Sequence, residues 1–308
     1  MKRKYALWTN DVETHSIWLN DLNIETGRRV VREGIPKLLD IYDELGIKST
    51  FFFNCDIAKP FPDAVRAVHS RGHEIGSHGL THDHRLAFDT LSYQEQSEHL
   101  KQSKRILEDA IGEAIVSFRA PALRVNDHTP RALVDNDYLI DSSVASQRFD
   151  FMMSFGAKSK LKWLTAPRRV YKTKDSDLSK MGSDGVIEVP LSALIIPYVG
   201  TVMRISPILT KGIRAILNYE QRLFPSQIVF DIHPNEMIEE SDRERSITRR
   251  SSSYIQYVLA DVVRSKMKIK NLGDRCTPIY IDNIRYFRDK GYRSVSLKHY
   301  CTEIGLLK

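Results

Sequence analysis

The chain has 308 residues, of which 42% are hydrophobic and 28% charged, and this balance excludes a disordered or low-complexity protein. No apolar run reaches the roughly 20 residues that cross a bilayer as a helix, so we expect no membrane span. The formal net charge of +7 suggests anionic partners, but no groove-reading element or interleaved aromatics accompany the basic clusters, and nucleic acid is not an expected partner.

The start of the chain and its cysteines favour a cytoplasmic protein. The basic residues Lys2–Lys4 are followed at once by a predicted strand, not by the apolar segment of a secretory signal. Cys55, Cys276 and Cys301 are odd in number and widely spaced, which fits reduced thiols better than a disulfide framework. We therefore expect a cytoplasmic location.

The first quarter of the chain alternates predicted strands and helices. The helices are predicted from apolar residues at helical spacing and from the glycines that follow them, Gly46 and Gly72. In chain order the expected elements are a strand at 5–12, a helix at 35–45, a strand at 48–54, a helix from about 62 to 71 and a strand at 73–76. This β-α-β-α-β order is typical of a parallel sheet covered by helices.

The rest of the chain continues the pattern with one interruption. Ser92 and Glu95 form a capping box that opens a long helix, and Gly112 follows its end. Later elements are expected as strands at 115–118, 139–143, 186–190, 228–234 and 294–297, with helices from 129 and at 277–291. No periodicity fixes residues 149–180, which we expect to form an insertion that folds over the mouth of the site.

Polar side chains fall at or just past the carboxyl ends of these strands. They are Asp11, Glu13, His78, His82, Arg119, Asp141 and His233. In a parallel barrel those ends converge on one mouth. His78 and His82 are four residues apart, which is metal-ligand spacing if the segment is helical or tightly turned, although the same spacing also occurs on solvated helix faces.

The order of these stretches resembles the five motifs of the polysaccharide deacetylase family, the NodB-homology carbohydrate esterases of family 4. The stretches are Thr9–Glu13, His78–His82, Arg119–Pro121, Asp141–Ser143 and Ile232–Pro234. The Asp-x-Glu opening, Glu188–Pro190 and Met203–Arg204 resemble the branch encoded with exopolysaccharide biosynthesis. Three features depart from the common pattern: Val12 stands where most members have a second aspartate, Asp83 stands where many have proline, and the fourth motif lacks its tryptophan.

The resemblance implies one domain over residues 1–308, apart from the insertion. Its expected fold is α/β, a distorted (β/α)7 barrel of the NodB-homology and glycoside hydrolase/deacetylase kind. The implied activity is metal-dependent hydrolysis that removes N-acetyl groups from an N-acetylhexosamine-containing glycan or glycan precursor.

The resemblance also implies roles for individual residues. A divalent metal, with zinc as the expected ion, is assigned to Glu13, His78 and His82, and it would activate a water and polarise the acetyl carbonyl. Asp11 is expected as the general base and His233 as the acid that protonates the departing amine. Other assigned roles are an ion pair with Asp11 for Arg119, orientation of Arg119 or substrate contact for Asp141, and substrate contacts for Pro121, Ala122 and Arg204. His15 is expected to be an ordinary histidine, while Asp231 and Glu236 flank His233 and receive no role.

Two other functions stay open at this point. One is hydrolysis of another small or cyclic amide, as in allantoinase-like relatives, and the other is a non-catalytic carbohydrate-binding protein. The intact set of polar residues argues against the second, because an inactive relative would be expected to lose the base or a ligand. The expected partner is a carbohydrate, lipid-linked or anionic, with at most peripheral membrane contact through the apolar segment 194–217.

Overall fold

A nine-stranded sheet organises the computed structural model, which describes residues 3–148, 158–241, 254 and 257–307. Seven neighbouring strands run parallel, and the other two form an antiparallel hairpin at one edge. The parallel strands are, in sheet order, β13 (Gln227–Ile232), β1 (Tyr5–Val12), β4 (Thr50–Phe53), β5 (Glu74–Ser77), β6 (Ser117–Phe118), β7 (Ile140–Asp141) and β10 (Ile187–Glu188). The predicted seven-stranded α/β barrel is thus confirmed, as a curved sheet with incomplete closure.

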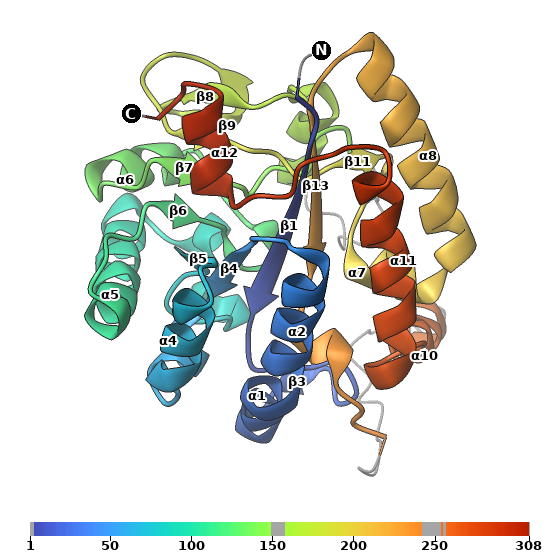
Figure 1. Ribbon diagram of the computed structural model, residues 1–308. Coiled ribbons are helices and arrows are strands. Elements are labelled where there is room, and N and C mark those ends of the chain that lie inside the picture. The colour runs from blue at the N-terminus through green and yellow to red at the C-terminus, as the bar shows by residue number, and fades with distance from the viewer. Residues whose placement is uncertain (1–2, 149–157, 242–253, 255–256, 308) are drawn as a thin grey trace.

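Helices cover the outside of this sheet (Figure 1). The longer ones are α2 (Ile35–Leu45), α4 (Pro62–Ser70), α5 (Tyr93–Ile111), α6 (Thr129–Asp135), α8 (Pro207–Leu223) and α11 (Cys276–Arg288). Shorter ones are α1 (Ile24–Arg29), α3 (Cys55–Ala58), α7 (Gly200–Ile205), α10 (Arg264–Lys268) and α12 (Leu297–Glu303). The predicted caps hold: Ser92 and Glu95 form the capping box of α5, and Gly46 ends α2 in the left-handed conformation.

β1 is the central strand and is buried along its whole length. It pairs with β13 on one side, where Thr9 lies opposite Asp231, and with β4 on the other. Its even-numbered residues face the helices, since Trp8 packs edge-on against Tyr280 of α11 and Asn10 accepts a 2.7 Å hydrogen bond from Tyr42 of α2. Its odd-numbered residues therefore face the barrel interior, and Asp11, as one of them, points toward the site.

The two edges of the parallel sheet meet just beyond β10. Ser192 N donates a 3.1 Å hydrogen bond to Val229 O of β13, and Val229 N donates a 3.0 Å bond to Ser192 Oγ. This contact partly closes the barrel and draws the end of β13 toward the ends of the other strands.

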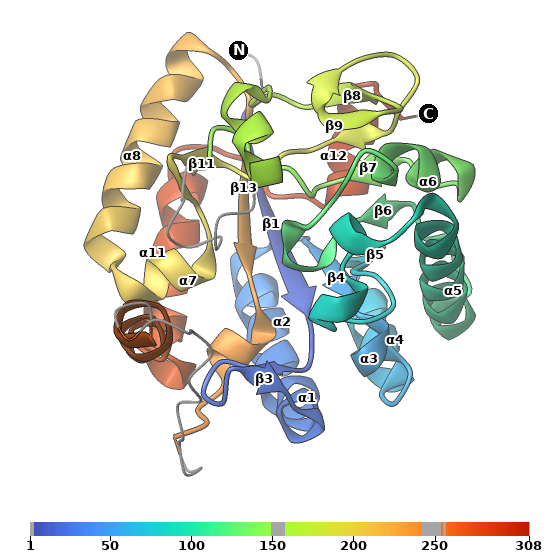
Figure 2. The same ribbon diagram turned by 180° about the vertical axis from the view of Figure 1, so that it is seen from behind.

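Two sequence-based expectations differ from the structure. The strand predicted at 294–297 is wrong, because Ser296 caps helix α12 from Leu297, and only Arg293 forms a bridge to Tyr5. Of the expected insertion, 149–157 lie outside the described residues, and part of the remainder forms the hairpin β8 (Tyr171–Lys174) and β9 (Asp177–Met181). That hairpin lies at the opposite end of the molecule from the carboxyl end of β1, where the mouth is (Figures 1 and 2). This part of the insertion therefore does not cover the mouth.

Gly34 offers a test of how tightly the segment after β13 is packed. A Cβ on Gly34 would overlap the carbonyl of Pro234, whereas one on Gly212, in the exposed face of α8, would meet open space. We expect Gly34→Ala to destabilise the protein by about 1–3 kcal/mol and Gly212→Ala to be neutral or to stabilise it by about 0.5–1 kcal/mol. Urea unfolding of both variants measures this, and equal shifts would contradict the close packing.

Candidate metal centre and acid–base site

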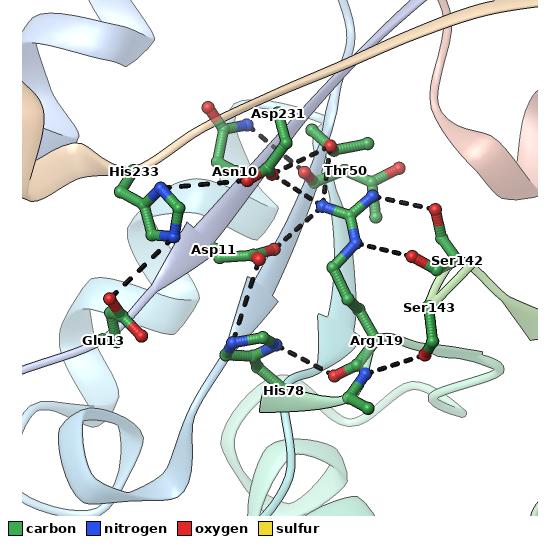
Figure 3. Close-up of polar contacts among 12 residues, drawn as sticks. Asn10, Asp11, Glu13, Thr50, His78, Arg119, Ser142, Ser143, Asp231 and His233 are labelled. Carbon is green, nitrogen blue, oxygen red and sulfur yellow. Dashed lines mark hydrogen bonds and ion pairs between the residues drawn. The ribbon is translucent and has the colours of Figure 1, made fainter. Parts of the chain in front are cut away.

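Side chains from four of the parallel strands and the loops after them meet at the carboxyl end of the sheet (Figure 3). β1 and its following turn supply Asp11 and Glu13, and β5 leads into His78. β6 is followed by Arg119, and β13 carries Asp231 and leads into His233. These residues come from opposite ends of the chain because β13 pairs with β1.

Glu13, His78 and His82 form one compact group of possible metal ligands. Their ligand atoms all lie within 4.8 Å of one another, and His82 Nε2 is 2.8 Å from Glu13 Oε2. Glu13 Oε2 is buried, and its close contact is with this imidazole nitrogen. A buried carboxylate that faces imidazole nitrogens fits a divalent cation, and two histidines with one carboxylate are a common zinc ligand set.

The loop that carries the two histidines is turned, not helical. Gly79 has φ +74°, a conformation that glycine adopts without strain, and it reverses the chain directly after His78. Asp56 Oδ2 then accepts hydrogen bonds from Thr81 Oγ1 at 2.7 Å and from His82 N at 3.2 Å. The four-residue spacing therefore brings both imidazoles to one point through a turn that Asp56 holds.

His78 is oriented and neutral. Its Nδ1 lies 2.9 Å from Arg119 O, which directs Nε2 toward the site. Burial lowers the pKa of His78 to about 4, although the charges of Asp11 and Glu13 oppose that shift. A neutral imidazole is the form that binds a metal.

Arg119 is the buried cation beside this group. Its Nη1 lies 2.9 Å from Asp11 Oδ1 and 2.6 Å from Asp231 Oδ1, and its Nε and Nη2 donate to the carbonyl and hydroxyl oxygens of Ser142 at 2.9 and 2.8 Å. Burial raises the pKa of Asp11, but the charges of Arg119 and His233 outweigh it and hold that pKa below its usual value. Asp11 is thus kept ionised and oriented.

Asp231 and His233 complete the other side of the site. Burial, with repulsion from Asp11, raises the pKa of Asp231 to about 7. Burial lowers the pKa of His233, but Asp231, Glu13 and Asp11 together raise it to about 9. The His233 ring lies between two carboxylates, with Nδ1 3.8 Å from Asp231 Oδ2 and Nε2 3.9 Å from Glu13 Oε1. At neutral pH this ring carries a proton that it can donate.

Asp141 lies deeper than the substrate-contact prediction requires. It is fully buried, and its carboxylate accepts hydrogen bonds from the hydroxyl of Ser143 at 2.7 Å and from its backbone N–H at 3.2 Å. Ser142, not Asp141, makes the hydrogen bonds to Arg119. Burial raises the pKa of Asp141 and of its strand neighbour Glu188, so ionising both carboxyl groups at once is unfavourable. This pair lies behind the site. The predicted substrate contact of Asp141 is therefore corrected: its carboxylate supports the backbone and hydroxyl of Ser143 instead.

The predicted substrate residues fall in different places. Pro121 is buried against Gly79, and Ala122 is exposed with φ +52° on the loop after β6, so their proposed roles stay predictions. Arg204 is fully buried in an ion pair with Glu236, 2.8 Å from its carboxylate. Its predicted substrate contact is corrected for that reason.

The structure brings in two residues that the sequence had left without a role. Asp231 contacts Arg119 directly, and the signal for it was its position two residues before His233 on the same face of a strand. His15 is partly buried, with its ring centroid 6.3 Å from that of His82, and burial lowers its pKa to about 4. Nothing in the local sequence distinguishes His15, because its proximity to His82 arises from the turn after β1.

Arg119→Met tests whether the charge of Arg119 keeps the buried carboxylates Asp11 and Asp231 ionised. In the wild type the lowered pKa of Asp11 gives stability that is present above its unfolded pKa and lost as the pH falls. Without Arg119, the pKa values of Asp11 and Asp231 in the folded protein rise, so the folded state binds more protons than the unfolded state and stability falls as the pH rises. We expect metal-free Arg119→Met to lose about 3–5 kcal/mol at pH 8 and less at pH 5.

Urea unfolding at the two pH values measures the effect of Arg119→Met. Arg66→Met is the control, because Arg66 forms an exposed ion pair with Asp63, and it should change little at either pH. An equal loss of stability at pH 5 and pH 8 would contradict the charge-balance account.

Comparisons with known proteins bear on the family and the fold. Residues 11–139 match the family model for polysaccharide deacetylase. A peptidoglycan deacetylase of Helicobacter pylori is 23% identical over 146 residues, which are 45% of this chain and 49% of that protein, so the chain spans about half the length of this curated relative.

Two solved structures share the fold over most of the chain. A putative polysaccharide deacetylase from Mycobacterium smegmatis superposes with a TM-score of 0.56 at 20% identity, covering 96% of this chain and 94% of that one. A family 4 carbohydrate esterase pseudoenzyme from Bacillus anthracis gives 0.51 at 13% identity, covering 97% and 65%. The exopolysaccharide branch and the single-domain extent stay predictions. By the matched segment 11–139 and the shared fold, the chain is similar to the polysaccharide deacetylases, the NodB-homology carbohydrate esterases of family 4.

Proposed function

We propose that the protein is a metal-dependent hydrolase that removes N-acetyl groups from an N-acetylhexosamine unit of a glycan or glycan precursor. One observation carries the proposal: a compact group of metal ligands, Glu13, His78 and His82, lies between an ionised carboxylate, Asp11, and a protonated imidazole, His233. An acid and a base on two sides of a cation site suit amide hydrolysis.

Zinc is the metal we propose for Glu13, His78 and His82. These residues supply two imidazole nitrogens and one carboxylate, which leaves coordination positions for water and substrate. When bound there, the metal would polarise the acetyl carbonyl and lower the pKa of an adjacent water.

Asp11 is the proposed general base, and Oδ2 is its reactive atom. Arg119 holds Oδ1 at 2.9 Å, whereas Oδ2 faces His78 Nε2 at 3.8 Å and so points toward the ligand group. Because Asp11 stays ionised, Oδ2 can accept a proton from the attacking water. The ion pair with Arg119 also prevents the carboxylate from rotating away.

His233 is the proposed general acid. Its Nδ1 faces Asp231 and its Nε2 faces the ligand group, so Nε2 is the atom that can reach the departing nitrogen. Donation at this atom is required because an amide anion is too poor a leaving group. Asp231 keeps the imidazolium oriented and favours its charge.

Elemental analysis and acetate release test this proposal on the wild type, three site variants and one control variant. We expect near-stoichiometric zinc in the wild type and in Asp11→Asn, and its loss in Glu13→Gln and His78→Ala. Acetate release from N-acetylglucosamine oligomers should fall by about 10²–10⁴-fold in Asp11→Asn because the base is removed without the metal. His69→Gln, a partly exposed histidine outside the site, is the control and should match the wild type.

Other results would select a different function. Metal-loaded protein that hydrolyses cyclic amides but releases no acetate would favour the allantoinase-like alternative. A metal-free wild type that cannot be reloaded with metal would reject the hydrolase proposal and favour a carbohydrate-binding protein. The intact acid, base and ligand residues argue against that alternative, because a binding protein does not need them. The cytoplasmic location stays a prediction that cell fractionation would check.

For the partner, we propose that the outer face of α8 contacts an anionic membrane surface. The predicted apolar segment 194–217 is partly internal, since Ile213 and Leu217 pack in the core. The opposite side of α8 and the residue after it expose an apolar stripe: Ile208, Ile216, Tyr219, Leu223 and Phe224, each between 56% and 85% exposed. α8 lies at the edge of the molecule in both views (Figure 2).

The charge around this stripe favours anionic lipid. Lys211 and Arg222 are exposed on α8, and its one acidic residue, Glu220, pairs with Arg168 at 2.9 Å. An apolar stripe flanked by basic side chains matches the pattern of helices that lie in the membrane interface. No helix among the described residues is long and apolar enough to cross a bilayer.

Liposome sedimentation tests the α8 contact. We expect binding to vesicles that contain phosphatidylglycerol, weak binding to neutral vesicles, and loss of binding in Ile216→Glu/Leu223→Glu. Met181→Glu, which changes an exposed apolar residue of β9, should bind as the wild type does. Absence of binding to both vesicle types would reject the proposal, and dimers that the double variant dissociates would assign the stripe to a second copy of the chain.

A further inference from the structure

A buried ion pair lies under the loop that follows β13. Arg204 of α7 and Glu236 are both fully buried, and Arg204 donates from Nε and Nη2 to Glu236 Oε1 at 3.0 and 2.8 Å. Thr201 Oγ1 donates to the same oxygen at 2.9 Å. A Cβ on Gly200 would overlap Glu236 Oε2, so the carboxylate packs against the backbone at the start of α7.

The other oxygen of this carboxylate reaches His233. His233 N donates to Glu236 Oε2 at 3.3 Å, and Glu236 N donates back to His233 O at 2.9 Å. These two bonds close the turn at Pro234–Met237, with the Glu236 carboxylate accepting from the N–H of its N-cap residue, His233. Glu236 therefore fixes the backbone from which the His233 ring projects toward Glu13 and Asp231.

Arg204 also ties this turn to the end of α10. Its Nη1 donates to Lys268 O at 2.7 Å and to Lys270 O at 2.9 Å, while Asn271 Nδ2 donates to Arg204 O at 2.7 Å. The planar guanidinium thus serves a carboxylate on one edge and two carbonyls on another, a geometry that a lysine ammonium cannot reproduce.

We propose that Arg204 and Glu236 are positioning residues for His233, through which α7 and the end of α10 set the place of the proton donor. This inference rests on the deacetylation proposed above. The ion pair does not touch the ligand group, so it acts on the reaction through His233. Glu236 fixes the backbone of that residue, and its charge helps to raise the pKa of the His233 imidazole.

A double-mutant cycle on the metal-loaded full chain tests the proposal. We expect Arg204→Lys to lower kcat by about ten- to a hundredfold, since small displacements of a reacting group cost that much, with little change in KM or zinc content. In a His233→Ala background the same substitution should have no further effect. An equal loss of kcat in both backgrounds, or a change confined to KM, would overturn the proposal.

Arg214→Lys is the matched control. Arg214 is also an almost buried arginine, paired with Asp282 at 2.9 Å and stacked on Tyr286, but it makes no contact with the His233 turn. It should leave kcat unchanged in both backgrounds. If Arg204→Lys does not fold, as judged by its thermal unfolding, Glu236→Gln replaces it, because this variant keeps the volume and removes the charge.

A readout independent of activity separates this inference from the proposed function. The imidazole NMR signal of His233, assigned by its loss in His233→Ala, should shift in Arg204→Lys or Glu236→Gln but not in Arg214→Lys. An unchanged His233 signal would overturn the inference even if the enzyme is active. A wild type that releases no acetate, with the shift present, would reject deacetylation and leave the positioning of His233 supported.

Discussion

The buried guanidinium of Arg119 is the charge on which the rest of the site depends. One of its nitrogens lies within 2.9 Å of carboxylate oxygens from both Asp11 and Asp231. Without this cation, repulsion between the two negative charges would keep one of the carboxyl groups protonated. With Glu13 nearby, three buried carboxylates share this one permanent positive charge. The site is therefore short of positive charge, which the His233 imidazolium and the proposed divalent cation would supply.

The strand order explains how that charge arrangement is assembled. Because β13 pairs with β1 in parallel register, Thr9 lies opposite Asp231, and its hydroxyl donates to Asp231 at 3.0 Å and accepts from Arg119 at 2.8 Å. Arg119 enters from β6, three strands away from β1, and spans the barrel interior over the ring of Phe52, whose centroid is 4.5 Å from Cζ. A long side chain is required here, since it links the two sides of an incompletely closed sheet.

The sequence predicted those parts of the protein that depend on local signals. Helical spacing with Gly46 and Gly112 as ends, and the box of Ser92 and Glu95, identified α2 and α5 correctly. Residues 294–297 were misread because Ser-Val-Ser-Leu alternates like a strand, while Ser296 acts as a helix cap. In such a short segment periodicity alone cannot separate the two.

The parts of the site that escaped prediction depend on partners distant in the chain. The resemblance assigned Arg204 to the substrate. Its observed partner, Glu236, lies 32 positions later, and no local pattern links the two. Ser142 was hidden for the same reason, since it stands next to the more conspicuous Asp141 but is the residue that reaches Arg119. The order of the motifs predicted which stretches of the chain meet at the site. Which residue of each stretch makes which contact could be learned only from the packing in the structure.

The two histidines of the ligand group are anchored by different means. His78 directly follows β5, and its N–H continues the strand ladder by donating to Phe53 O at 2.9 Å, so folding of the sheet fixes it. His82 lies on a turn attached through the carboxylate of Asp56, and its side chain is 11% exposed against 2% for His78. Exchange of a bound ion with solvent should thus proceed from the His82 side, and Asp56 would govern how fast an ion enters and leaves more than how the empty protein folds.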